Sequence, residues 1–234
     1  MRATSGWRRI GAVAVFAVGG ALGCAVEATA QPRLEVTASG GRWGGYQLGQ
    51  RRPTLTGPQV PTGSPVTLFD ADVSVQPGGA AEVRIGWRLL QRVYAEATGG
   101  LGVNDVRVRV SEDIEQAPDV TIASRLTQIT IEGGALVEVG RLGALGGELV
   151  PFVTGGAGYL RQVHEDRVLI ETGQTAYGGT GIKWRSTVAR PKGLLQRIVV
   201  RGDVRLVSRS GGADIDESRR SYITVSGGVG LLLF

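Results

Sequence analysis

One stretch of the sequence, Leu195 to Ser208, alternates between two kinds of side chain and constrains the fold more than any other feature. From residue 198 onward, the apolar residues and one glycine fall on one side: Ile198, Val200, Gly202, Val204 and Leu206. The other side carries most of the charge: Val199, Arg201, Asp203, Arg205 and Val207. Successive side chains of a β-strand point to opposite faces, so this stretch predicts a strand with one apolar and one charged face. Such a strand fits either a soluble sheet or a transmembrane barrel with lipid outside and a polar lumen.

Seven further stretches have strand-like patterns, and no convincing helix lies between them. They are residues 33–46, 81–89, 92–103, 125–139, 148–161, 174–186 and 220–234. The first loses its alternation over Gly40 to Gly45, which predicts a β-bulge there. In the last, apolar residues occur on both faces, so the face that points outward is left open.

The connections between these strands alternate in length. Long polar connections are expected at 47–80, 104–124 and 162–173, and short ones at 90–91 and 140–147. Long loops at one end and tight turns at the other are typical of an outer-membrane barrel with both termini in the periplasm. The long segments are therefore expected to face the exterior.

The first 30 residues have the features of a cleavable signal peptide. Arg2, Arg8 and Arg9 form a basic beginning, residues 10–22 are apolar, and residues 28–30 (Ala-Thr-Ala) match a small-residue cleavage site. The apolar run is too short for a spanning helix, and no later stretch is long enough either. We expect a signal peptide over 1–30 and one barrel domain over 31–234.

The single cysteine, Cys24, lies inside this leader. Its surroundings loosely resemble a lipid-attachment motif, and whether it is lipidated is left open. A chain cleaved after Ala30 would have no cysteine, so neither disulfides nor thiolate metal sites are expected, and no cofactor is predicted. Only Lys183 and Lys192 are lysines, and no run of four basic residues occurs, so nucleic-acid binding is not expected.

Four features occur together in this sequence: the leader, the eight alternating strands, the alternating connections and the final Phe234. This combination resembles the small eight-stranded outer-membrane β-barrels of the OmpA/OmpX type. The resemblance implies an all-β, eight-stranded antiparallel transmembrane barrel, integral to the cell outer membrane and in contact with its lipid. It also implies that the barrel assembly machinery recognises the C-terminal strand ending at Phe234. The best aromatic girdle candidates are Trp43, Trp87, Tyr159, Trp184 and Phe234.

The alternation assigns one set of side chains to lipid and another to the lumen. The expected lipid-facing residues are Val83, Ile85, Trp87, Ile129, Ile131, Val137, Val200, Val204 and Leu206. The expected lumen residues are Glu35, Glu82, Arg84, Arg88, Glu96, Glu132, Glu138, Lys183, Arg201, Asp203 and Arg205. Eight strands leave room only for side chains, so these charges should pair, with Glu132 and Glu138 as the first partners for Arg201 and Arg205. A network that closes the barrel is expected; a small gated conduit is the alternative.

His164 is the only histidine and the one catalytic candidate. Some outer-membrane barrels are lipid-modifying enzymes that use histidine, serine and a carboxylate, and Glu165 or Asp166 could orient His164. No serine lies within ten residues of it, however. The acidic runs 112–115 and 214–217 lack the spacing of a calcium loop, so no metal site is predicted. We expect a non-enzymatic barrel with a structural or surface-interaction role and an unknown extracellular ligand.

Overall fold

The computed structural model describes residues 34–55, 66–112, 118–165, 170–186, 195–212 and 219–233, and within them the only regular secondary structure is the β-strand. Eight long strands are β1 (Leu34–Trp43), β6 (Gly78–Leu90), β7 (Val93–Ser111), β8 (Val120–Glu138), β10 (Gly147–His164), β11 (Ile170–Ser186), β12 (Leu195–Gly211) and β13 (Arg220–Leu233). Five shorter ones are β2 (Tyr46–Arg51), β3 (Thr54–Leu55), β4 (Val66–Thr67), β5 (Asp70–Val75) and β9 (Leu142–Ala144). None of the described residues forms a helix long and apolar enough to span a membrane.

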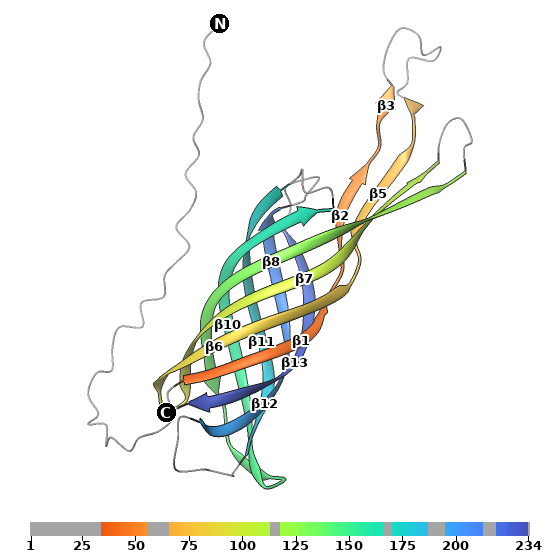
Figure 1. The fold of residues 1–234 in the computed structure, drawn as a ribbon. Helices are drawn as coiled ribbons and strands as arrows, with labels where there is room; N and C mark the ends of the chain where they lie inside the picture. Colours follow the sequence, from red (N-terminus) through yellow and green to blue (C-terminus); the bar gives the residue numbers. More distant parts are fainter. Residues whose placement is uncertain are drawn as a thin grey trace, which may run out of the picture. The chain divides into compact units, whose positions relative to one another are not determined.

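The eight long strands close into a ring (Figure 1). They run in the order β7-β6-β1-β13-β12-β11-β10-β8, and β8 pairs with β7 to complete the circle. Every pairing is antiparallel. Closure satisfies the backbone hydrogen bonds that an open sheet leaves at its edges. The predicted eight-stranded antiparallel barrel is confirmed.

The two ends of the barrel differ. Leu34 of β1 is the register partner of Leu233 of β13, so the first and last described strands meet at one end, here called the lower end. At the upper end, β7 and β8 continue past the ring as a long hairpin, and β2 and β5 add to it (Figure 1). We call this four-stranded sheet the extension: β2, β5, residues 105–111 of β7 and residues 120–125 of β8.

The prediction of long loops was wrong where the extension forms, because much of those segments is strand. The 47–80 connection contains most of β2 together with β3, β4 and β5, and most of the described part of 104–124 belongs to β7 and β8. Much of 162–173 is also strand. The physical reason lies in residues 105–110, Asp-Val-Arg-Val-Arg-Val, whose strict alternation favours a strand even though half of it is charged.

Strand β1 bears out its predicted loss of alternation in part. Its pairing with β6 and β13 runs without a register shift as far as Trp43, so no bulge occurs over residues 40–43. The strand breaks instead at Gly44 and Gly45, and the alternation changes phase there, because Trp43 and Tyr46 are both buried. Trp43 therefore keeps the inward direction of Glu35, and its side chain is only 4% exposed. Room for the indole comes from Gly100 and Gly102 of β7, where a Cβ would press against the ring.

Trp43 is thus not part of an outer aromatic girdle. Trp87 and Tyr159 are exposed on the outside of the barrel, and Trp184 is partly exposed. Phe234, the signal peptide over 1–30 and the acidic run 214–217 lie outside the described residues. The orientation of the last strand is now clear: Ile223, Val225 and Val229 are exposed, whereas Leu232 is buried.

Candidate functional site

An apolar belt surrounds the outside of the barrel. The predicted lipid-facing residues are all exposed: Val83, Ile85, Trp87, Ile129, Ile131, Val137, Val200, Val204 and Leu206, at 40–70%. The belt comprises the outward side chains of residues 34–40, 81–89, 93–103, 127–137, 149–159, 176–184, 198–206 and 223–233. Every one of them is apolar or aromatic, glycine or threonine, and none is charged. The first charged outward residues above it include Arg42, Asp105, Arg125 and Arg161.

The lumen contains six buried acids and six buried bases within the described ranges. They are Glu35, Glu82, Glu96, Glu132, Glu138 and Asp203, with Arg84, Lys183, Arg185, Arg201, Arg205 and Arg209. Arg88 is less buried than the other predicted lumen residues. It lies half-buried at the lower rim, where its guanidinium donates a hydrogen bond to the Gln91 carbonyl. Sequence reasoning missed Arg185 and Arg209, although each shares the parity of a predicted lumen residue, Lys183 and Arg205 respectively.

Asp203 is the centre of the network. Its carboxylate hydrogen bonds to the Arg84 guanidinium and lies 3.0 Å from Nε of Arg201 and 3.1 Å from Nε of Arg205. Three cations around one carboxylate require further acids, and β6, β7 and β8 supply them. Glu82 pairs with Arg84, Glu96 with Arg201 at 2.5 Å, and Glu132 with Arg205 at 3.5 Å.

The pairing differs in part from the prediction. Arg205 does pair with Glu132, but Arg201 pairs with Glu96. Glu138 lies near the lower end of the lumen, too far along β8 to face Arg201, and it pairs with Arg185 instead. Lys183, also near that end, lies 2.7 Å from Glu35, with Nζ 5.1 Å from the centroid of the Tyr94 ring. Cation–π contact of this kind stabilises a buried ammonium.

Amides and tyrosines fill the upper end of the lumen. Gln162 donates to Gln128 at 2.9 Å, and Gln128 donates to Asn104 at 2.8 Å. Tyr46 accepts from Gln162 and Arg209 and stacks on Tyr222, with ring centroids 5.3 Å apart. These side chains are buried. They cap the charged network with hydrogen-bonded groups, as expected for an interior that holds side chains and not a channel.

His164 lies at the end of β10 and meets a carboxylate that the sequence had not indicated. Its Nε2 is 3.6 Å from Oε2 of Glu171 on the neighbouring strand β11. Glu165 instead accepts a hydrogen bond from the backbone N–H of Arg125 at 3.2 Å, and Asp166 lies outside the described residues. In the described part of the chain, no hydroxyl or thiol hydrogen bonds to His164, and no group of acidic or histidine side chains could hold a metal ion.

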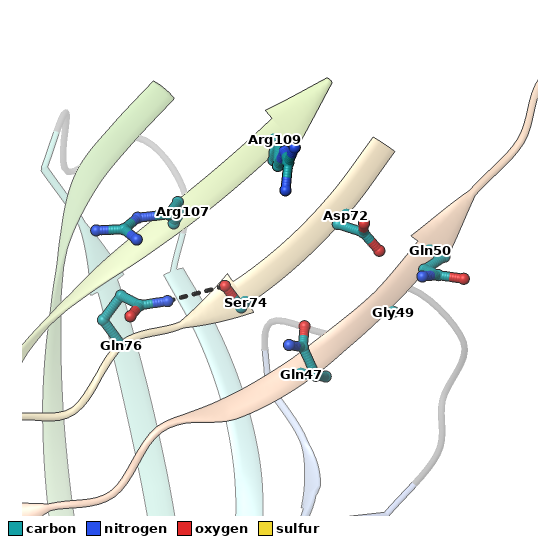
Figure 2. Close-up of a pocket in the computed structure, with 8 residues that line it drawn as sticks. All are labelled: Gln47, Gly49, Gln50, Asp72, Ser74, Gln76, Arg107 and Arg109. Atoms are coloured by element: carbon teal, nitrogen blue, oxygen red, sulfur yellow. Dashed lines mark hydrogen bonds between the residues drawn. The ribbon is translucent and has the colours of Figure 1, made fainter. Parts of the chain in front are cut away.

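A hollow opens on the outward face of the extension (Figure 2). Its volume is about 510 Å³, and three neighbouring strands, β2, β5 and β7, contribute most of its lining. The lining residues are Gln47, Gly49, Gln50, Asp72, Ser74, Gln76, Arg107 and Arg109. Sequence reasoning missed this site because it treated 47–80 and 104–124 as loops.

No protein-family model and no curated protein matches this chain. Solved outer-membrane proteins share its general architecture. OprG from Pseudomonas aeruginosa has a TM-score of 0.42 and 9% identity, with 86% of this chain and 95% of that one covered. Ail of Yersinia pestis, in complex with the heparin analogue sucrose octasulfate, has a TM-score of 0.36 and 9% identity, with 85% of this chain and 98% of that one covered. The protease OmpT of Escherichia coli has a TM-score of 0.36 and 9% identity, with 86% of this chain and 97% of that one covered. Similarity at this level carries no information on activity or ligand.

Proposed function

We propose that this chain is an integral outer-membrane barrel with a structural or surface-interaction role and no catalytic activity of its own. The apolar belt is the observation that carries the proposal. Monomeric soluble proteins rarely expose apolar patches of more than a few hundred Å². Here apolar side chains that are roughly half exposed continue around a closed ring, a surface that suits lipid and not water.

The height of the belt also fits a bilayer. On β7, β8, β10 and β13, residues without an outward charge span 93–103, 127–137, 149–159 and 223–233. A tilted transmembrane strand needs about 9–11 residues to cross the hydrocarbon core. The distribution of charge, outside the belt and inside the lumen, is the inside-out arrangement of membrane barrels.

The packed lumen favours a structural role over a conduit. Its charges pair within the barrel, and its upper end is filled by amide and tyrosine side chains. We therefore assign the interaction role to the extension, which we place outside the cell. Both ends of the described chain then face the periplasm, where the barrel assembly machinery would recognise the C-terminal strand.

Membrane fractionation with heat-modifiable gel mobility tests the proposal. The protein should remain with the outer membrane after osmotic release and after washing with high salt. An unheated sample should migrate differently from a boiled one, because a closed barrel resists detergent unfolding. A protein released freely into the soluble periplasmic fraction would exclude a membrane barrel.

The lipid-modifying alternative rests on His164. Its pairing with Glu171 provides a base and an orienting carboxylate, but no nucleophile is in contact with it in the described residues. We expect His164→Ala to leave the lipid composition of the producing cells unchanged, as measured by mass spectrometry. A lipid species that disappears in the variant and returns with the wild-type chain would establish the enzyme instead.

A further inference from the structure

The hollow on the extension contains an ordered array of polar groups. Register pairs Gln47 with Ser74 and Ser74 with Arg107, which gives one row across three strands. A second row consists of Gln50, Asp72 and Arg109 in the same way. The side chains of both rows lie on the same side of the three strands (Figure 2). Polar groups at strand spacing thus form two regular rows on one face of the sheet.

A β-bulge completes this array. Residues three apart on a regular strand point to opposite faces, so Gln47 and Gln50 would not share a side. The register of β2 against β5 shifts between Gln47 and Gly49, and Gly49 has a φ of 136°, a conformation that favours glycine. The extra residue turns Gln50 to the face of Gln47. Bulges commonly redirect a side chain in this way near functional sites.

The array rests on a packed apolar layer. Leu48, Val75 and Val106 point to the other side of the same strands and are at most 8% exposed, with Val73 packed against them. This layer continues the lumen packing beneath the extension. The polar rows are therefore held on a rigid sheet, which lowers the conformational entropy lost when a ligand binds.

The chemistry of the lining selects a hydrophilic ligand with an acidic group. The hollow has no apolar side chain, whereas ordinary small-molecule pockets are mostly apolar. Glutamine and aspartate side chains offer donors and acceptors for neighbouring hydroxyl groups. Among the described residues, no carboxylate lies within ion-pair distance of Arg107, while Arg109 is 2.8 Å from Asp119, which raises the pKa of the Arg109 guanidinium. A guanidinium without a partner suits a carboxylate or phosphate.

We propose that the hollow formed by Gln47, Gln50, Asp72, Ser74, Arg107 and Arg109 binds an acidic saccharide. Arg107 holds the carboxylate or phosphate, and Gln50 and Asp72 hold ring hydroxyls. This inference deepens the proposed surface role by naming a ligand class. Arg107 lies four residues beyond Val103, at the edge of the belt. Both a membrane glycolipid headgroup and a soluble acidic polysaccharide can therefore supply the saccharide.

Calorimetric titration of the full chain in lipid nanodiscs tests the inference. Tri-galacturonate is the acidic probe, and maltotriose is the neutral probe of equal length. We expect Arg107→Gln to weaken tri-galacturonate binding about tenfold or more, because it removes a charge-assisted hydrogen bond. Arg125→Gln is the matched control, since Arg125 is an exposed arginine on neighbouring β8 that does not line the hollow; it should change affinity less than about twofold. Unchanged heat-modifiable mobility shows that each variant is folded.

Nanodiscs with and without lipopolysaccharide distinguish the two sources. Lipopolysaccharide that competes with tri-galacturonate in the wild type but not in Arg107→Gln identifies the headgroup as occupant. Tri-galacturonate binding that lipopolysaccharide leaves unchanged identifies a soluble saccharide. Equal weakening by Arg107→Gln and Arg125→Gln, equal binding of maltotriose, or no binding of tri-galacturonate would each overturn the inference. Recovery of the protein in the soluble periplasmic fraction would contradict the membrane proposal, independently of these binding results.

Discussion

Arg201 of β12 and Glu96 of β7 meet across the middle of the barrel, with Nη1 of the arginine 2.5 Å from Oε1 of the glutamate. Their side chains are 1% and 2% exposed. Arg201 also lies over the Phe152 ring at 4.5 Å from its centroid and contacts Asp203. This pair joins strands on opposite parts of the ring, so it links the barrel wall through its interior.

Replacing Arg201 with methionine should destabilise the barrel. The variant leaves the Glu96 carboxylate buried without its main partner, at a cost of about 3–5 kcal/mol in the free energy of unfolding. Urea unfolding in lipid vesicles measures it. The double variant Arg201→Met with Glu96→Leu should recover much of the loss. Arg109→Met, which breaks an exposed pair, is the control and should leave the urea midpoint unchanged. If Arg201→Met changes the urea midpoint as little as Arg109→Met does, water fills the lumen.

The packing of Trp43 gives a second prediction. A Cβ at Gly102 would overlap the indole ring, whereas a Cβ at Gly99, on the same strand but facing outward, meets no atom within 4 Å. Gly102→Ala should therefore cost about 1–3 kcal/mol of overpacking, and Gly99→Ala should be nearly neutral. Urea midpoints of the two variants provide the comparison. Gly102→Ala should cost less in a Trp43→Leu background than in the wild type, because the smaller side chain leaves room for the added Cβ; an equal loss in both backgrounds would place the strain elsewhere.

Alternation in the sequence was sufficient to predict the ring, because burial on one face imposes a two-residue period on each strand. It assigned Arg201, Asp203 and Arg205 inward and Ile131 and Val204 outward, as the structure has them. Where a face held both glycine and leucine, as in β13, the pattern left the direction open. Only closure of the ring against β1 and β12 determines it.

The partners of the lumen charges could not be predicted, because they depend on the stagger between strands. Glu138 and Glu132 have the same parity, yet they lie six residues apart along a tilted strand. Glu138 pairs with Arg185, and Glu132 pairs with Arg205. The hollow was also beyond reach, since it depends on a bulge at Gly49 and on register between β2, β5 and β7. The alternation over 105–110 was the available signal, and it was taken for a loop.

The filled lumen predicts an electrically closed barrel. Reconstituted protein in a planar bilayer should show no stable current, because paired charges, amides and tyrosines occupy the interior from Lys183 to Tyr46. An open porin in the same bilayers is the positive control. A steady single-channel conductance of the wild-type chain would favour the conduit instead, and would require the network around Asp203 to open.

The belt can be tested at single residues, because two isoleucines on β8 are similarly exposed in different surroundings. Ile131 is 70% exposed near the middle of the belt, and Ile122 is 59% exposed in the extension. In lipid vesicles, Ile131→Arg places a charge near the bilayer midplane and should cost about 2–4 kcal/mol. Ile122→Arg should change stability by less than about 0.5 kcal/mol, as surface substitutions usually do.

Urea unfolding of the two variants in vesicles gives the comparison, and the same measurement in detergent micelles should show a smaller difference between them. For a soluble barrel, water would surround both sites, and the two arginines would be equally harmless. Equal stability of Ile131→Arg and Ile122→Arg in vesicles would therefore contradict a membrane-spanning belt. A large loss at Ile131 alone would place lipid against the outward face of β8.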